Sequence, residues 1–299
     1  MTTTQDLIAA ATSMDAVSLL VADLDGMTAY YRDVIALDVL DAVAPTEQPG
    51  AGRTGASVVL GRRGVPVVVL RHAPDLPRAA RGQAGLFHTA ILFEDRAGLA
   101  ATVASVATKA PDSYVGSADH LVSLAFYFTD PEGNGIELYW DRARSEWQWD
   151  GSRPRMATLP LDPNGFLGDH LTDAGLEQPG AGNAGVGHVH LQVGDVGLAR
   201  SFYVDALGFE VTGLMHGALF VAAGGYHHHM AMNTWNSAGA GPRASSLGLG
   251  EVAILVPARD DLGALAERLT RHGVPVRDDG AALAFEDPWR NLIRVSADH

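Results

Sequence analysis

The sequence predicts an α+β fold in which four copies of one small βαβββ module form two cup-shaped mixed sheets. Three observations lead to this prediction. Two pairs of segments repeat along the chain, which is typical of modular architectures. Strand-like runs with apolar residues at every second position alternate with helix-like stretches. The length of 299 residues suits about two domains, each with its own core.

The first repeat opens each half of the chain. Residues 17–23 (VSLLVAD) lead to an aromatic pair at 30–31, and residues 189–195 (VHLQVGD) lead to a similar pair at 202–203. The two segments align without a gap. In both, alternating apolar residues predict a strand, and the closing Asp is well placed to cap the helix that follows.

The second repeat closes each half. Residues 88–93 (HTAILF) match 251–256 (EVAILV), and both precede a helix-like stretch rich in Ala and Leu. Residues 130–138 (DPEGNGIEL) match 287–295 (DPWRNLIRV), and each of these is a turn that leads into a final strand. The repeats therefore predict four modules in two halves, with a connection between the halves.

The predicted modules lie near residues 14–73, 86–141, 186–236 and 248–297. Taken in sequence order, they give a first domain at 14–141 and a second at 186–297, joined by a connection at 142–185 that is rich in Gly, Pro and Asp. A sheet with helices on one side and a concave face on the other fits these patterns.

Composition narrows the function. The formal charge of −14 argues against a nucleic-acid partner, which needs a clustered basic surface, and favours small, uncharged or weakly charged substrates. Because the chain has no cysteine, any metal must be held by His, Asp or Glu. The first residues do not resemble a signal peptide, and no apolar run reaches the roughly 18 residues of a membrane span. We therefore expect a cytoplasmic protein without a membrane partner.

Three motifs carry a resemblance to a known superfamily. They are residues 120–137 (HLVSLAFYFTDPEGNGIE), 187–193 (GHVHLQV) and 224–229 (GGYHHH). The chain resembles the glyoxalase, bleomycin-resistance and extradiol dioxygenase superfamily over nearly its whole length, and within it the four-module bacterial catechol 2,3-dioxygenases. Ala118 departs from the extradiol signature, but it lies outside the reacting groups. The resemblance implies a vicinal oxygen chelate fold, in which two modules form a cup around a metal, and suggests a homodimer.

The resemblance also implies a reaction and roles for residues. An extradiol dioxygenase uses Fe(II) and O₂ to break the ring of a catecholic substrate beside its two hydroxyls. In the matching motif, His120 is the acid/base residue, Tyr127 hydrogen-bonds a substrate oxygen, and Glu137 binds the metal. These roles suit the chemistry, because a catechol must lose protons to chelate a metal and imidazole exchanges protons near neutral pH.

The remaining ligands follow from the repeat. In the superfamily one ligand lies on the first strand of a module, seven residues before the Asp that caps the helix. His88 has this spacing to Asp95, and His188 has it to Asp195. The first module has Ala16 at this position and has lost its ligand. Two His and one carboxylate would leave three positions open for the two catechol oxygens and O₂.

The ligands also predict which modules face each other. Modules one and two together lack one ligand, and modules three and four would place Arg294 where Glu137 lies in the second module. Only modules two and three supply a complete set, His88, His188 and Glu137. Modules one and four would then share the second cup, where Glu251 and Arg294 are placed to form an ion pair.

Several points stay open at the level of sequence. His227 or His229 is expected to line the cup or to support a ligand, because alternate residues of a strand share a face. His190 is either a substrate contact or structural. The metal is Fe(II) or Mn(II), both of which suit imidazole and oxygen ligands. The alternatives are a glyoxalase-like lyase or isomerase, which usually has four protein ligands, and a non-catalytic protein that binds an aromatic drug.

Overall fold

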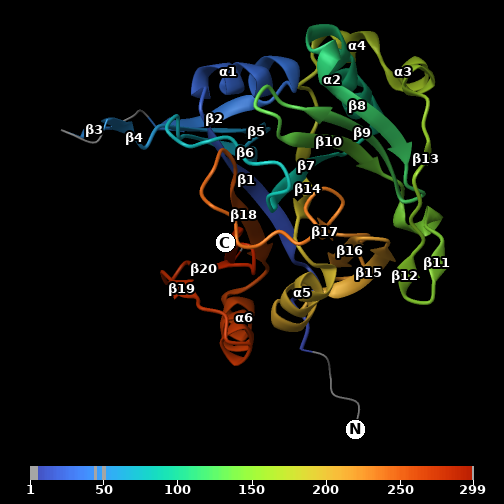
Figure 1. Cartoon of the computed structure of the whole chain (residues 1–299). Coiled ribbons are helices and arrows are strands. Elements are labelled where there is room, and N and C mark those ends of the chain that lie inside the picture. The colour runs from blue at the N-terminus through green and yellow to red at the C-terminus, as the bar shows by residue number, and fades with distance from the viewer. Residues whose placement is uncertain (1–5, 44–45, 49–51, 298–299) are drawn as a thin grey trace.

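The computed structural model describes residues 6–43, 46–48 and 52–297, and two large mixed sheets dominate it (Figure 1). The strands of the first sheet lie in the order β19 (Arg277–Asp278), β20 (Ala282–Glu286), β21 (Leu292–Ala297), β18 (Gly248–Val256), β1 (Ser13–Val21), β6 (Val65–His72), β5 (Ser57–Arg62) and β2 (Asp38–Val43). The strands of the second lie in the order β13 (Leu159–Pro160), β8 (Tyr114–Asp119), β9 (Ser123–Thr129), β10 (Gly135–Asp141), β7 (Gly85–Phe93), β14 (Ala184–Gln192), β17 (Met230–Asn233), β16 (Ala218–Ala222) and β15 (Glu210–Met215).

Two short hairpins lie outside these sheets. They are β3 (Thr46–Gln48) with β4 (Gly52–Thr54), and β11 (Trp149–Asp150) with β12 (Arg153–Pro154). The helices are α1 (Leu24–Ala29), α2 (Arg96–Lys109), α3 (Pro163–His170), α4 (Asp173–Glu177), α5 (Val196–Arg200) and α6 (Arg259–Arg271). Short π-helical turns extend α1 and α5, at Tyr30–Val34 and Ser201–Ala206, and 3₁₀ turns lie at Pro111–Ser113 and Arg144–Glu146. None of the helices in the described ranges is both long and apolar enough to cross a membrane.

Each module has the predicted βαβββ order. The first runs β1, α1, β2, β5, β6, and the second runs β7, α2, β8, β9, β10; the third and fourth follow the same pattern from β14 and β18. The predicted helix caps are present in the first three modules, where Asp23, Asp95 and Asp195 each accept a backbone N–H from the first helical turn. The α+β fold of four modules is confirmed.

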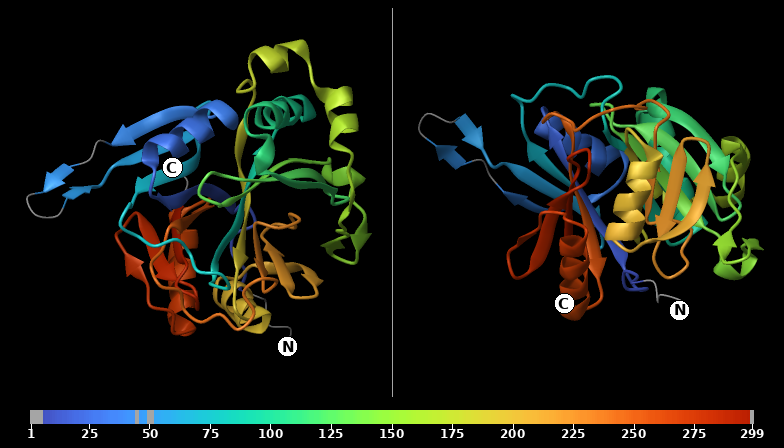
Figure 2. Two further views of the ribbon diagram at one scale, coloured as in Figure 1. Left: turned by 45° about the horizontal axis from the view of Figure 1, so that its top comes forward. Right: turned by 60° about the horizontal axis from the view of Figure 1, so that its bottom comes forward.

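The two sheets combine modules from opposite halves of the chain. β1 pairs antiparallel with β18, so modules one and four share a sheet, and β7 pairs antiparallel with β14, so modules two and three share the other. This is the pairing predicted from the ligands. Figure 2 shows that the second half of the chain interleaves with the first. The division into domains at 14–141 and 186–297 stays a prediction. In the structure, each of these halves gives one module to each sheet.

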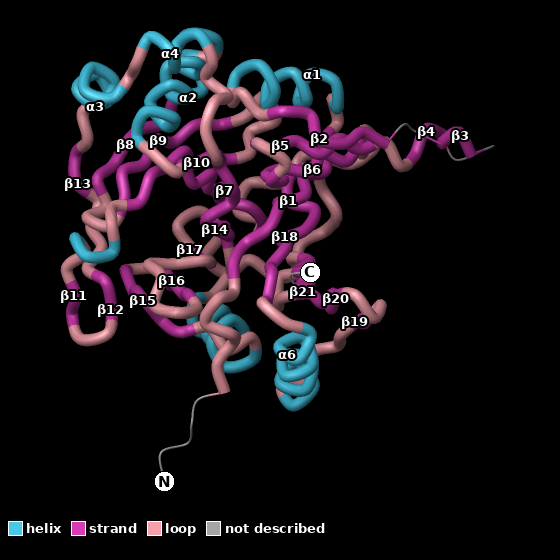
Figure 3. The backbone as a smooth tube through the Cα atoms, turned by 180° about the vertical axis from the view of Figure 1, so that it is seen from behind, coloured by secondary structure: helices cyan, strands magenta, loops and turns pink. Residues whose placement is uncertain are grey.

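Two equivalent tyrosines join modules that lie in different sheets. The hydroxyl of Tyr31 in module one donates to Asp130 Oδ2 in module two at 3.1 Å, and that of Tyr203 in module three donates to Asp287 Oδ2 in module four at 2.9 Å. Both hydrogen bonds are buried. The helices lie on the outside of the sheets, and α3 and α4 pack on α2 beside β8–β10 (Figure 3). The inner face of β7, β10 and β14 is thereby left for side chains that point into the cup.

The second cup, between modules one and four, differs from the prediction. Arg294 lies beside Ala253 in the β18–β21 register, so Glu251 is two positions away along its strand. Glu251 instead lies 3.9 Å from Arg71 on β6, and Arg294 pairs with Asp279 at 3.2 Å. The predicted Glu251–Arg294 ion pair is therefore wrong, because each of the two side chains lies beside a different residue of opposite charge.

Candidate active site

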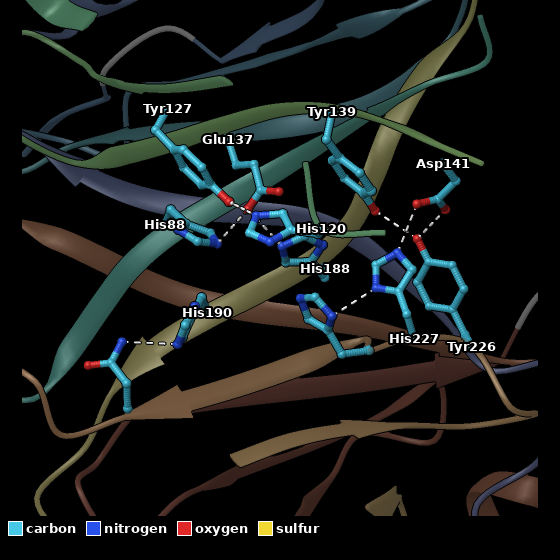
Figure 4. Close-up of polar contacts among 12 residues, drawn as sticks. His88, His120, Tyr127, Glu137, Tyr139, Asp141, His188, His190, Tyr226 and His227 are labelled. Carbon is cyan, nitrogen blue, oxygen red and sulfur yellow. Dashed lines mark hydrogen bonds and ion pairs between the residues drawn. The ribbon is translucent and has the colours of Figure 1, made fainter. Parts of the chain in front are cut away.

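The three predicted ligands lie on three adjacent strands. Glu137 on β10 and His188 on β14 are both register partners of Ala90 on β7, one on each side of it. His88 is two residues before Ala90 and therefore shares its face of the sheet. The methyl group of Ala90 occupies little space at the centre of this row. The row therefore directs one carboxylate and two imidazoles to a single point, as Figure 4 shows.

The distances within this cluster fit a metal ion. Glu137 Oε2 lies 2.9 Å from His88 Nε2 and 3.1 Å from His188 Nε2, and all three side chains are buried. Two ligands at right angles, each about 2.1 Å from an ion, would be about 3 Å apart. His88 Nε2 makes no hydrogen bond although Glu137 Oε2 is so near, because the two atoms do not have the geometry of a hydrogen bond. Donor chemistry and spacing both suit a divalent cation.

The ionisation states of the cluster also suit metal binding. Burial lowers the pKa of His188 to about 4, so its imidazole is neutral at neutral pH. Burial alone would raise the pKa of Glu137, but the adjacent His188 and His88 lower it well below its usual range. An ionised carboxylate and a neutral imidazole are the forms that bind metals.

His120 and Tyr127 lie next to this cluster. Tyr127 on β9 is the register partner of Glu137, while His120 lies in the turn before β9, where Leu121 has a φ of 69°. His120 Nδ1 lies 2.6 Å from the carbonyl oxygen of Ala157, and Nε2 lies 2.6 Å from the Tyr127 hydroxyl. Because a carbonyl only accepts, Nδ1 carries the proton and Nε2 accepts from Tyr127. Burial, followed by the charge of Glu137, raises the pKa of Tyr127 well above 10, so it stays a donor.

The histidine triplet behaves differently from the prediction. His228, the middle residue, lines the cavity above the ligands, and its ring centroid is 4.0 Å from that of His188. His227 bonds Asp141, and Nδ1 of His229 accepts the Ala223 N–H. Of the two roles expected for an outer histidine, lining the cup is wrong for His227 and His229, while support of a ligand stays a prediction. Strand alternation does not apply here, because β17 begins only at Met230.

A chain of partly buried hydrogen bonds sets the proton positions of His228. Asp141 accepts from the Tyr226 hydroxyl at 2.7 Å and from His227 Nε2 at 2.8 Å. His227 Nδ1 is then without a proton and accepts from His228 Nδ1, 2.8 Å away. This leaves His228 Nε2 as a bare acceptor. Sequence reasoning missed that His228 lines the cavity, because its placement depends on a contact between His227 and Asp141, which lie 86 residues apart.

His190 also lines the cavity. Asn233 Nδ2 donates to its Nε2 at 3.0 Å, and burial lowers the pKa of His190 well below 6.5. Its ring packs edge-to-face on Phe87 and Trp235. His190 is therefore a neutral, firmly held part of the cavity wall. A contact between His190 and a substrate stays a prediction.

Gly187 gives a prediction about how this site is packed. A Cβ at Gly187 would lie 1.7 Å from the hydroxyl oxygen of Tyr139, a fully buried ring that packs on His188 and bonds Tyr226. We expect Gly187→Ala to lower the free energy of unfolding by about 1–3 kcal/mol. The matched control is Gly185→Ala on the same strand, where the nearest atom, on Val65, is 3.5 Å away. Urea unfolding of both variants is the measurement, and equal stabilities would contradict this account of the packing.

The comparisons with known proteins agree with this fold. Residues 13–138 and 185–295 match the family model of the Glyoxalase/Bleomycin resistance protein/Dioxygenase superfamily, and the chain belongs to this superfamily. A catechol-2,3-dioxygenase of Bacillus subtilis (strain 168) is 37% identical over 212 residues, which cover 70% of this chain and 73% of that protein.

Solved structures share the fold at low sequence identity. One from Bacillus subtilis subsp. subtilis str. 168, whose name places it among dioxygenases, aligns with a TM-score of 0.63 at 14% identity over 96% of this chain and 85% of that one. Glyoxalase I from Zea mays aligns with a TM-score of 0.55 at 16% identity over 96% and 92%. At these identities the likeness concerns the fold alone.

Proposed function

We propose that the protein is an extradiol ring-cleaving dioxygenase that acts on a catecholic substrate with O₂ at an Fe(II) centre held by His88, His188 and Glu137. The observation that carries the proposal is the donor set. Two His and one carboxylate, with room beside them, are typical of non-haem Fe(II) oxygenases. The 37% identical catechol-2,3-dioxygenase supports the same reaction. Mn(II) also prefers such ligands and is the alternative ion.

The number of ligands separates this proposal from a glyoxalase-like lyase or isomerase. Such an enzyme usually has four protein ligands, and a fourth ligand from the histidines at 227–229 would favour it. Among the described residues, the cluster contains three members and His228 is not one of them. The buried triad likewise speaks against a simple drug-binding cup, which needs no metal ligands.

The chain's own residues supply the proton chemistry. When bound, Fe(II) would supply the redox chemistry with O₂ and the Lewis acidity for chelation of a diol. We assign His228 as one proton acceptor, because its bare Nε2 belongs to a ring that lines the cavity beside His188. His120 is the second, because its Nε2 becomes free to accept a proton when the Tyr127 hydroxyl, which donates to it in this structure, turns toward the substrate. Tyr127 donates a hydrogen bond to charge that develops on a substrate oxygen.

Oxygen uptake tests the proposal. Protein purified without O₂ and loaded with Fe(II) should consume O₂ on mixing with catechol and form a yellow product. The same protein loaded with Zn(II), which has no redox chemistry, should bind catechol without consuming O₂. An Fe(II)- and Mn(II)-loaded protein that binds catechols but consumes no O₂ with any of them would contradict the proposed reaction.

A further inference from the structure

The cavity above the ligands is larger than a single aromatic ring requires. Its volume is about 430 Å³, and His88 and Glu137 form part of its wall. Cavities of roughly 300–1,000 Å³ hold drug-sized ligands. A catechol that chelates a metal at this wall would therefore leave much of the space unfilled, so the size indicates a substrate with a further group.

The charged residues that line the cavity indicate that this further group is not an anion. Among the described residues that line it there is no Lys or Arg, and Glu137 is the only carboxylate. A carboxylate on the substrate would have no guanidinium or ammonium to pair with, and burying an unpaired charge is costly. The net charge of −14 also disfavours the approach of an anion.

The side chains at the mouth of the cavity indicate that the further group on the substrate is apolar. Three large apolar side chains border it although they are well exposed: Val115 at 66%, Met215 at 41% and Trp235 at 50%. They come from β8, from β15 and from the segment after β17. Met156, from the connection between the halves, also lines the wall. Exposed apolar side chains gathered around one opening are typical of a binding site for an apolar group.

We infer that the substrate is an uncharged catechol with a bulky apolar substituent, which extends from the metal ligands to the mouth formed by Val115, Met215 and Trp235. This inference rests on the proposed function for the catechol part and on the cavity for the substituent. A carboxylated catechol is disfavoured, because its carboxylate would have no Lys or Arg among the lining residues to pair with. Met215 and Trp235 are specificity residues, and they contact the substituent and not the reacting oxygens.

Steady-state kinetics with two substrates test the inference. For the Fe(II)-loaded enzyme, kcat/KM for 4-tert-butylcatechol should exceed that for 3,4-dihydroxybenzoate by about 10²-fold. The tert-butyl group gains affinity by burying its carbons, and the carboxylate loses affinity because its charge has no partner. Met215→Lys should reduce this ratio by at least about tenfold, because it places an ammonium at the mouth. The matched control is Leu214→Lys, which adds the same charge at an exposed neighbour that does not line the cavity. It should leave the ratio unchanged.

Binding measured without O₂ separates this inference from the proposed reaction. Calorimetric titration of the Fe(II)-loaded protein under nitrogen should show the same preference for 4-tert-butylcatechol, and the same loss of preference in Met215→Lys. If that preference is found but no catechol is cleaved in air, the proposed reaction fails and the assignment of the cavity stands. Equal affinity for the two compounds, or an equal effect of Met215→Lys and Leu214→Lys, would overturn the inference.

Discussion

Replacing His188 with alanine is expected to remove the metal as completely as replacing His88 or Glu137. The three side chains converge on one point although His188 comes from the other half of the chain. Each substitution removes one of three ligands, so metal affinity should fall by more than the roughly 10²-fold that loss of an outer hydrogen-bonding partner causes. The measurement is iron content after gel filtration, with about one iron per chain expected in the wild type from the one such cluster among the residues that the structure describes.

The control for this experiment is a histidine far from the cluster. His272→Ala, at the exposed end of α6, should keep the wild-type iron content. Near wild-type iron in His188→Ala would refute the assignment of the ligands and would return the site to the first half of the chain. Two tightly bound irons per wild-type chain would equally contradict a single shared site.

Replacing Tyr127 with phenylalanine is expected to leave iron content nearly intact while turnover of catechol drops by roughly 10²–10⁴-fold, the range for a lost proton-handling group. The substitution removes only the hydroxyl, which bonds His120 and lies outside the ligand cluster. His120→Ala should have an effect of similar size for the same reason. The measurements are kcat of ring cleavage and iron content in the same preparations.

The control for the tyrosine is Tyr114→Phe. This residue lies on the neighbouring strand β8, is exposed, and its hydroxyl bonds Ser117. Its loss should change neither turnover nor iron. If Tyr127→Phe instead loses iron, Tyr127 supports the metal and not the proton chemistry, and its assignment is wrong.

The two histidines of the cluster could be predicted from the sequence because they follow from repetition, while Glu137 came from the motif at 120–137. His88 and His188 occupy equivalent positions on the first strands of modules two and three. Equivalent positions of equivalent strands direct their side chains to the same face of the sheet. The shared cup of modules two and three followed from counting ligands, and the strand order confirms it. The roles of these residues at a bound metal stay proposals that the variants above test.

Other parts of the site lie in segments without a regular period. His228 is in an irregular turn, so alternation placed the wrong members of the triplet in the cup. The connection at 142–185 shows only a composition typical of linkers, yet Ala157 provides the carbonyl that orients His120, and Met156 lines the cavity. Such contacts depend on long-range packing, which local sequence patterns do not encode.

The pairing of β1 with β18 has a consequence for how the chain folds during synthesis. β18 begins more than 220 residues after β1 ends. At about 5–20 residues per second, a ribosome needs roughly 10–50 s to supply the partner. Contacts so distant along the chain raise the contact order and slow folding. Modules two and three are complete earlier, so the sheet that carries the proposed iron ligands can assemble while β1, which already has β6 on one side, still lacks β18 on the other.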